Sequence, residues 1–177
     1  GELEGGRLEE GSYEGYAAGG VAVIVKVLTD NKNRSAAAVR HAFSKADANL
    51  AEQGAVSRMF KRKGQILINK NEIEEDKLME IIIEAGAEDL KIYEEHYEVL
   101  TSPTDFEIVS EEISKAGINL DDSDITFISD TISEINDKDQ AKKIMSFIES
   151  LEELDDVQNV YSNFDISEDI AKEIEEN

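Results

Sequence analysis

The basic side chains of this chain are gathered in one stretch of an otherwise acidic sequence. The chain carries 18 Lys and Arg against 41 Asp and Glu, yet residues 26–70 hold ten of these cations and only three of the acids. Lys and Arg neutralise phosphates, and Arg can do so through two parallel hydrogen bonds. We therefore predict a nucleic-acid-binding set made of Arg34, Arg40, Lys45, Arg58, Lys61, Arg62 and Lys63. The alternative is that these cations form surface ion pairs with the protein's own acids, each of which contributes little to stability.

A segment rich in glycine and tyrosine, Tyr13–Gly20, stands before the basic stretch. Glycine adopts backbone conformations that other residues avoid, so we predict an interdomain hinge here. Its backbone amides could instead cradle phosphate, although phosphate-binding glycine loops follow a strand and open a helix, whereas this segment precedes a strand. Its tyrosines could stack on bases, and aromatic packing is the simpler interpretation. The predicted hinge motif comprises Tyr13, Gly15, Tyr16, Gly19 and Gly20.

No pattern of residues indicates catalysis or metal binding. The chain has no cysteine, and His41 and His96 lie far apart, neither with a metal-ligand partner four residues on. Asp121, Asp122 and Asp124 resemble a calcium loop only superficially, because the glycine and the closing Glu of such a loop are misplaced. We predict no catalytic residue, no metal and no cofactor. An enzyme with an acidic cleft and a divalent metal is the alternative from a different functional class.

A helix is predicted over residues 34–50, because apolar side chains recur there at helical spacing. The predicted buried stripe consists of Val39, Phe43, Ala46 and Leu50. At about 100° per residue, Arg34 and Lys45 fall on the opposite face of this helix and Arg40 on its flank. The helix would therefore present three of the predicted phosphate contacts to solvent.

The order of the predicted elements indicates an α+β fold. Residues 65–128 show the order strand, helix, strand, strand, helix, strand, which is that of a ferredoxin-like domain. The remaining segments repeat this order. They include the apolar central strand Val21–Leu28, the basic strand Ala55–Arg62 and the strand Ile132–Ile135. We predict two ferredoxin-like βαββαβ domains, the second inserted in the central hairpin of the first. A single irregular α+β domain is the alternative. The predicted boundaries are 1–20 for a linker and hinge, 21–63 with 130–165 for the first domain, 64–129 for the inserted second domain, and 166–177 for an acidic tail.

A long series of residues resembles the YebC family, also called PmpR-type regulators, whose relatives include the mitochondrial translational activator of cytochrome c oxidase. The matching segments are Tyr13–Tyr16, Gly19–Val25, Thr29–Asn31, Asn33–Arg34, Val39–Lys45, Asn49–Leu50, Met59–Phe60, Arg62–Gly64, Asp155–Tyr161 and Asn163–Asp165. The resemblance covers nearly the whole chain. The chain departs from the family pattern at Ala17–Ala18, where Gly-Pro is usual, and at Arg58, near which an aromatic residue is usual.

The resemblance implies a cytoplasmic, non-enzymatic gene-expression factor. Members are described as ribosome-associated translation factors that assist synthesis through difficult stretches such as consecutive prolines, and also as DNA-binding transcriptional regulators. It therefore implies the ribosome or ribosomal RNA as partner, with duplex DNA as the alternative. Family members also carry a basic N-terminal helical domain, which we expect this chain to lack. No apolar run approaches the roughly 20 residues that span a bilayer, so we predict no membrane partner.

Overall fold

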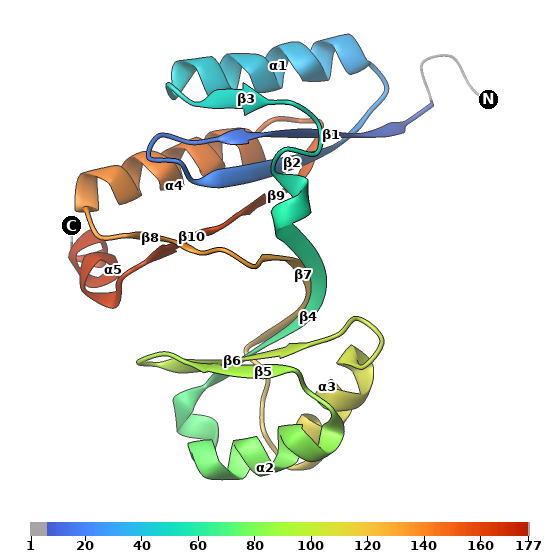
Figure 1. Ribbon diagram of the computed structural model, residues 1–177, viewed down its shortest axis with the longest axis vertical. Helices are drawn as coiled ribbons and strands as arrows, with labels where there is room; N and C mark the ends of the chain where they lie inside the picture. Colours follow the sequence, from blue (N-terminus) through green and yellow to red (C-terminus); the bar gives the residue numbers. More distant parts are fainter. Residues whose placement is uncertain (1–6, 177) are drawn as a thin grey trace. The chain divides into compact units, whose positions relative to one another are not determined.

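The computed structural model describes residues 7–176 and has an α+β fold, which confirms the predicted class (Figure 1). The chain divides into two compact units. The first unit comprises Gly1–Phe60 together with Ser129–Asn177, and the second unit comprises Lys61–Ile128. The second unit is thus inserted, in sequence, into the first.

A four-stranded sheet forms the centre of the first unit, with the strand order β3-β1-β2-β9. Strands β1 (Glu9–Tyr16) and β2 (Ala22–Thr29) pair antiparallel along their full lengths. Strand β3 (Asn49–Ala51) pairs antiparallel with the other edge of β1, and β9 (Val157–Ser162) pairs antiparallel with β2. The long register of β1 on β2 makes these two strands the base on which the helices of the unit pack.

Two helices, α1 (Lys32–Lys45) and α4 (Lys138–Glu152), supply the other half of the first core. Val23 and Val25 of β2 share this core with Phe43 and Phe147, whose rings meet edge to face with centroids 4.9 Å apart. Each helix begins at a side-chain cap, because Asn31 accepts a hydrogen bond from the Arg34 amide and Asp137 accepts one from the Gln140 amide.

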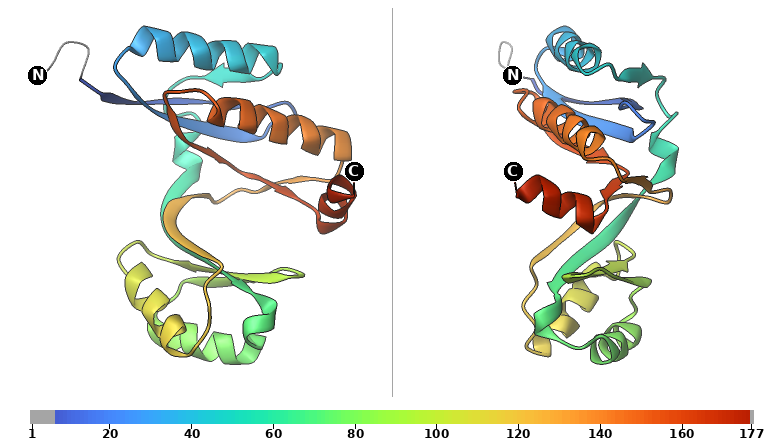
Figure 2. Two further views of the ribbon diagram at one scale, coloured as in Figure 1. Left: turned by 180° about the vertical axis from the view of Figure 1, so that it is seen from behind. Right: turned by 90° about the vertical axis from the view of Figure 1, so that its left-hand side faces the viewer.

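The rest of the first unit consists of short elements. Strands β8 (Ser133–Ile135) and β10 (Phe164–Ile166) form a separate parallel pair, and helix α5 (Glu168–Glu175) follows β10 (Figure 2). A 3-10 helix, η1 (Ser57–Met59), lies between β3 and β4.

The second unit has the sheet order β5-β6-β4-β7. Its elements are β4 (Phe60–Asn69), the 3-10 helix η2 (Lys70–Glu72), α2 (Glu75–Ala85), β5 (Asp89–Ile92), β6 (His96–Thr101), α3 (Phe106–Lys115) and β7 (Asp122–Ser129). Helices α2 and α3 lie side by side on one face of the sheet (Figures 1 and 2). The second core includes Ile66 and Val99 of the sheet and Leu78 and Ile113 of the helices.

Two predicted strands and the end of one predicted helix differ from the structure. Residues 55–59, predicted as part of a strand over Ala55–Arg62, form a turn and then η1, because their amides bond to a side chain of β1 instead of a neighbouring strand. The predicted strand Ile132–Ile135 corresponds to β8, which pairs with β10 and not with the four-stranded sheet. The predicted helix over residues 34–50 ends at Lys45, so that Leu50 belongs to strand β3.

The two predicted terminal segments also differ. Within the predicted linker over residues 1–20, Glu9–Tyr16 forms β1; residues 1–6 lie outside the described part. Within the predicted acidic tail over residues 166–177, α5 is capped by Ser167, and its Ile170 and Ile174 pack against the first core. Residue 177 is not among the described residues. β1 forms because it pairs with β2 and β3, and α5 forms where its apolar side chains can pack against the first core.

Candidate nucleic-acid interface

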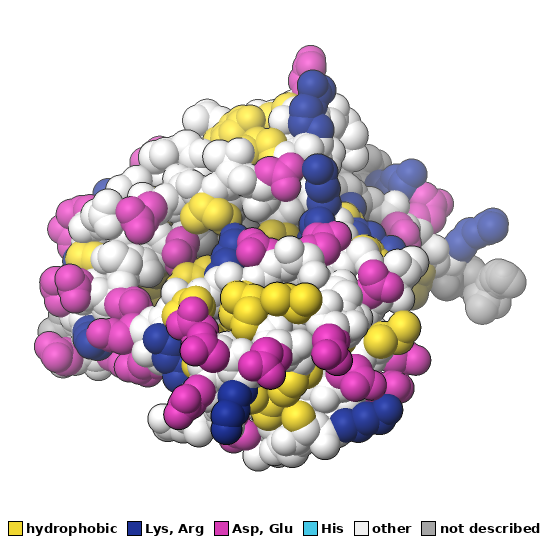
Figure 3. All heavy atoms as spheres, turned by 60° about the horizontal axis from the view of Figure 1, so that its bottom comes forward, with side chains coloured by type: hydrophobic (Ala, Val, Ile, Leu, Met, Phe, Trp, Pro, Cys, Tyr) yellow, Lys and Arg dark blue, Asp and Glu magenta, His cyan; other side chains and the backbone are white. Residues whose placement is uncertain are grey.

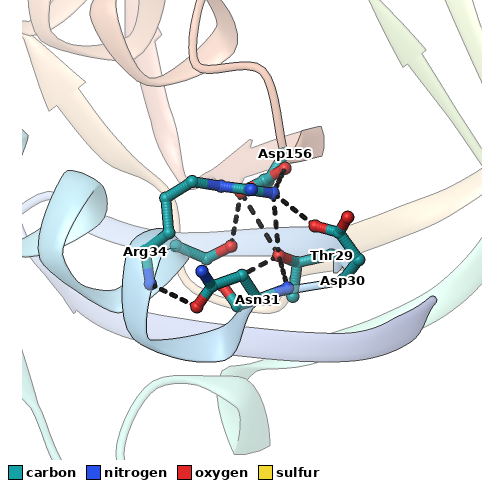
Figure 4. A network of polar contacts seen from close by, with 6 residues as sticks. Thr29, Asp30, Asn31, Arg34 and Asp156 are labelled. Carbon is teal, nitrogen blue, oxygen red and sulfur yellow. Dashed lines mark hydrogen bonds and ion pairs between the residues drawn. The ribbon is translucent and has the colours of Figure 1, made fainter. Parts of the chain in front are cut away.

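Arg34 is held in a network of polar contacts at the start of α1 (Figure 4). Its Nε and one terminal nitrogen donate to the two Asp156 carboxylate oxygens at 3.1 and 2.9 Å. The same terminal nitrogen lies 2.7 Å from Asp30 Oδ1. Asp156 also accepts a hydrogen bond of 2.6 Å from Ser35. Arg34 therefore joins the start of α1 to the turn that precedes β9.

The contacts of this network favour the ionised forms of Arg34 and Asp156. Hydrogen bonding to Asp156, and then to Asp30, raises the pKa of Arg34 above its usual value. Hydrogen bonds from Arg34 and Ser35 lower the pKa of Asp156. The donors that would bind a phosphate bidentately are thus already turned toward carboxylates of the protein. The geometry gives Arg34 a structural role, whereas its role as a phosphate contact stays a prediction.

Arg40 and Lys45 differ from Arg34 in their surroundings. Both are exposed on α1, and neither forms an ion pair within residues 7–176. Lys45 lies in the last turn of the helix, where the helix dipole favours a cation. His41 is exposed between them in sequence. These two cations are the members of the predicted set that α1 leaves available to a partner.

Arg58 lies in η1, in the turn region between β3 and β4. Its Nε donates to the backbone oxygen of Gly54 at 3.0 Å, and its side chain is exposed. The turn is held by Glu14 of β1, whose carboxylate accepts hydrogen bonds from backbone amides of this region. Glu14 was not among the predicted site residues. The signal that could have identified it is an acid that interrupts an otherwise uncharged run, Gly11–Ala22.

The other three predicted cations belong to the second unit, where they open strand β4. Lys63 forms an ion pair of 2.5 Å with Glu88, and its side chain is only 25% exposed. Lys61 and Arg62 are exposed, and Lys61 also interacts with another group of the protein. Four of the seven predicted residues therefore lie in the first unit and three in the second.

The predicted hinge motif forms a β-hairpin in the first unit. Tyr13, Gly15 and Tyr16 lie on β1, and the chain turns between β1 and β2 through Gly19 and Gly20. The φ angles of these two glycines are 87° and 84°, in the left-handed region that glycine tolerates. Within the turn, the Gly20 amide donates to the backbone oxygen of Ala17. This segment is a tight strand connection and not a hinge between domains, because both flanking strands are paired in one sheet.

Two members of this motif pack against neighbouring residues. A Cβ atom at Gly15 would lie 2.6 Å from the ring of Phe43 and would also collide with the backbone oxygen of Asn49. The ring of Tyr13 packs against the first core. Gly15 is thus needed for close approach, and aromatic packing, one of the two interpretations of Tyr13, is what the structure shows.

The described part of the chain has no cluster of metal ligands and has two hollows of different size. Among residues 7–176, no group of three or more His, Asp or Glu side chains is placed to hold a metal ion. A cavity of about 180 Å³ lies beside Arg34 and is lined in part by Val27, Ala38 and Leu154. This volume is below that of ordinary ligand pockets, which begin at about 300 Å³. A larger and more open hollow of about 560 Å³ is lined by α4, β10 and α5, with Met145, Phe164 and Ile174 among its residues. Over residues 7–176, no helix combines the length and the apolar character needed to cross a membrane.

Comparison with known proteins gives a consistent result over nearly the whole chain. A family model described as "TACO1/YebC second and third domain" matches residues 8–164. A probable transcriptional regulatory protein of Clostridium novyi is 52% identical over 170 residues, which are 96% of this chain and 69% of that protein. A protein of the same description from Halothermothrix orenii is 45% identical over 99% of this chain and 70% of its own length.

A solved structure also matches. The conserved hypothetical protein Aq1575 from Aquifex aeolicus is 45% identical in sequence, with a TM-score of 0.76. The match covers 94% of this chain and 69% of the Aquifex chain.

Proposed function

The chain belongs to the TACO1/YebC family, and from this membership we propose that it is a non-catalytic regulator of gene expression that acts by binding nucleic acid. The relatives named as probable transcriptional regulatory proteins support the general role. Within it, we propose a ribosome-associated translation factor that contacts ribosomal RNA and assists synthesis through stretches such as consecutive prolines. A cytoplasmic location is part of the same proposal.

The exposed cations of α1 are the observation that carries this proposal. With a net charge of −23, the protein as a whole repels a polyphosphate. Acidic side chains are spread over the face visible in Figure 3. The second unit alone carries seven Lys and Arg against 18 Asp and Glu. A nucleic acid must therefore be met by a limited basic surface, and Arg40 and Lys45 are exposed and unpaired within residues 7–176.

A DNA-binding transcriptional regulator is the second candidate, because the names of the relatives point to transcription. Both candidates use the same cations, since contacts to phosphate carry no sequence information by themselves. Double-stranded RNA is recognised mainly through its shape and its backbone. Exposed cations on a protein surface can therefore contact it without reading base edges.

We also propose that both units are ferredoxin-like. In the second unit, the chain order β4, α2, β5, β6, α3, β7 and the sheet order β5-β6-β4-β7 support this interpretation. In the first unit, β1 lies between β3 and β2 in the sheet. The sequence-based prediction places there a strand that follows α1 in the chain. That each unit is an independent domain, with the second inserted in the central hairpin of the first, stays a prediction.

Binding to two probes separates the two candidates. The 177-residue chain is mixed with purified bacterial ribosomes and sedimented, and in parallel it is titrated into labelled duplex DNA at the same salt concentration. Sedimentation with ribosomes together with weak DNA binding supports the translation factor. Tight duplex binding without co-sedimentation supports the transcriptional regulator. If the chain binds neither probe even at low salt, the proposal of a nucleic-acid-binding regulator is wrong.

A further inference from the structure

Glu14 is a buried acid in the middle of a strand. Glu14 is only 3% exposed, and its backbone pairs with Ile24 of β2 on one side and Ala51 of β3 on the other. Its neighbour Tyr13 packs against the core beneath α1 and α4. Because side chains alternate along a strand, Glu14 points to the opposite face of the sheet. An ionised group in such a place requires partners that compensate for lost water.

The partners are three backbone amides of one short segment. Glu14 Oε2 accepts a hydrogen bond from the Gly54 amide at 2.9 Å. Its Oε1 accepts from the amides of Val56 and Ser57, both at 2.8 Å. Burial raises the pKa of Glu14, but the three amide hydrogen bonds together outweigh it and leave the pKa below its usual value. The carboxylate is therefore ionised at neutral pH and binds the segment through charge-assisted hydrogen bonds.

The segment bound by Glu14, residues 54–58, carries an arginine at its end. The Arg58 side chain is exposed, but its Nε donates back to the oxygen of Gly54, the first residue that Glu14 holds. Val56, between them, is fully buried. A continuous series of contacts thus runs from Glu14 through Gly54 to the guanidinium of Arg58.

We infer that Glu14 is a positioning residue that fixes Arg58 for contact with a phosphate of the bound nucleic acid. This inference rests on the proposed function. An arginine on an unrestrained turn loses rotamer and backbone freedom when it binds, and that loss reduces affinity. A turn already fixed by three hydrogen bonds has lost this freedom in advance. Glu14 itself touches no ligand, since it is buried beneath the segment that it binds.

Replacing Glu14 with Gln tests this inference. The amide of Gln offers one acceptor oxygen and one NH₂ group, so at least one of the three backbone N–H groups must then face a donor. We expect faster hydrogen exchange at the amides of residues 54–57. We also expect weaker co-sedimentation with bacterial ribosomes, by about the same factor as in Arg58→Ala. The double variant should bind no more weakly than either single variant, because Glu14 acts through Arg58.

Glu10→Gln is the matched control. Glu10 lies four residues earlier on β1 and is exposed, and its side chain forms no hydrogen bond or ion pair within residues 7–176. The substitution removes the same charge from the same strand, which on its own would favour phosphate binding. Glu10→Gln should therefore bind ribosomes at least as well as the parent chain.

The outcomes distinguish this inference from the proposed function. If Arg58→Ala weakens binding and Glu14→Gln does not, the positioning role is wrong while the function stands. If the parent chain does not bind ribosomes, the translation factor is wrong, and the same variants are compared on duplex DNA, where the same order of affinities is expected. Unchanged exchange at residues 54–57 in Glu14→Gln would overturn the inference whatever the binding result.

A second variant covers the case in which Glu14→Gln does not fold. Gly54 has a φ of 92° with open space where a Cβ would stand, so Gly54→Ala strains the segment without a collision. Gly86→Ala is its control, because Gly86 caps α2 in the second unit with a φ of 100° and equally open space. Both variants should lose similar stability. Only Gly54→Ala should lose ribosome binding, and equal binding by the two would refute the positioning role.

Discussion

Removing the two exposed cations of α1 should change how strongly salt weakens binding. In Arg40→Ala/Lys45→Ala the helix should lose little stability, because both residues are exposed and the high helix propensity of alanine offsets the lost interaction of Lys45 with the helix dipole. Each phosphate contact releases counterions and adds about 0.7 to the slope of log affinity against log salt for single strands, or about 0.9 for duplex DNA. Two lost contacts should therefore flatten the slope by about 1.4 for a single-stranded RNA site and about 1.8 for duplex DNA.

This difference in slope is large enough to measure. For a fourfold rise in salt, the affinity of the parent chain should fall roughly seven- to twelvefold more than that of the variant. The assay is co-sedimentation with bacterial ribosomes over a salt series, with the dissociation constant determined at each concentration.

Lys142→Ala/Lys143→Ala is the control for this experiment. It removes the same charge from exposed positions of α4 in the same unit, and neither lysine forms an ion pair within residues 7–176. The slope of this control should stay close to that of the parent. Parallel lines for the parent and Arg40→Ala/Lys45→Ala would refute the argument, because phosphate contacts by these two side chains require different slopes.

Other expected outcomes concern the contacts that fix the first unit. Asp156→Asn should lower stability at pH 7, because Arg34 and Ser35 hold the pKa of this carboxyl below its usual value of 3.8. That contribution is fully present above pH 3.8 and is lost as the pH falls through the lower pKa of the folded state. In urea unfolding, the free energies of unfolding of the parent and the variant should therefore converge only in strong acid. An equal difference between them at all pH values would contradict this. Gly15→Ala should cost about 1–3 kcal/mol in urea unfolding, because its Cβ would meet Phe43 and Asn49, and a loss as small as an exposed substitution gives would show that the packing is looser than described.

The strongly patterned elements could be predicted from the sequence. The sequence predicts a strand over Val21–Leu28, and β2 occupies Ala22–Thr29, because apolar side chains on both faces favour a buried central strand. The buried stripe predicts a helix over residues 34–50, and α1 spans Lys32–Lys45. In the second unit, the predicted order of strands and helices over residues 65–128 is the order observed.

Elements that depend on a distant partner could not be predicted in this way. Glu9–Tyr16 is rich in glycine and glutamate and has weak strand propensity. It forms β1 because all eight of its residues pair with residues of β2. Residues 55–59 have the alternation of a strand, but hydrogen bonds from the backbone amides of this region to Glu14, about 40 residues away, favour a turn. Local pattern carries no information about such contacts.

The same limit applies to the candidate site. Residue type and spacing identified Arg34, Arg40 and Lys45 as equivalent cations on one helix. The structure separates them, because Arg34 is bound by Asp156 from 122 positions away, whereas Arg40 and Lys45 are not paired within residues 7–176. Charge pattern can therefore locate a cluster of cations in the sequence, but only the fold shows which of them are already bound by acids of the protein.

The claim that α1 faces nucleic acid can be tested directly with a single cross-link. The chain has no cysteine, so His41→Cys introduces a unique thiol that carries a photo-reactive group and leaves Arg40 and Lys45 in place. After irradiation with bound bacterial ribosomes, the account predicts cross-links to ribosomal RNA from residue 41 and far fewer from the control Lys143→Cys on α4. Cross-links to RNA that are no more frequent from residue 41 than from residue 143 would contradict it.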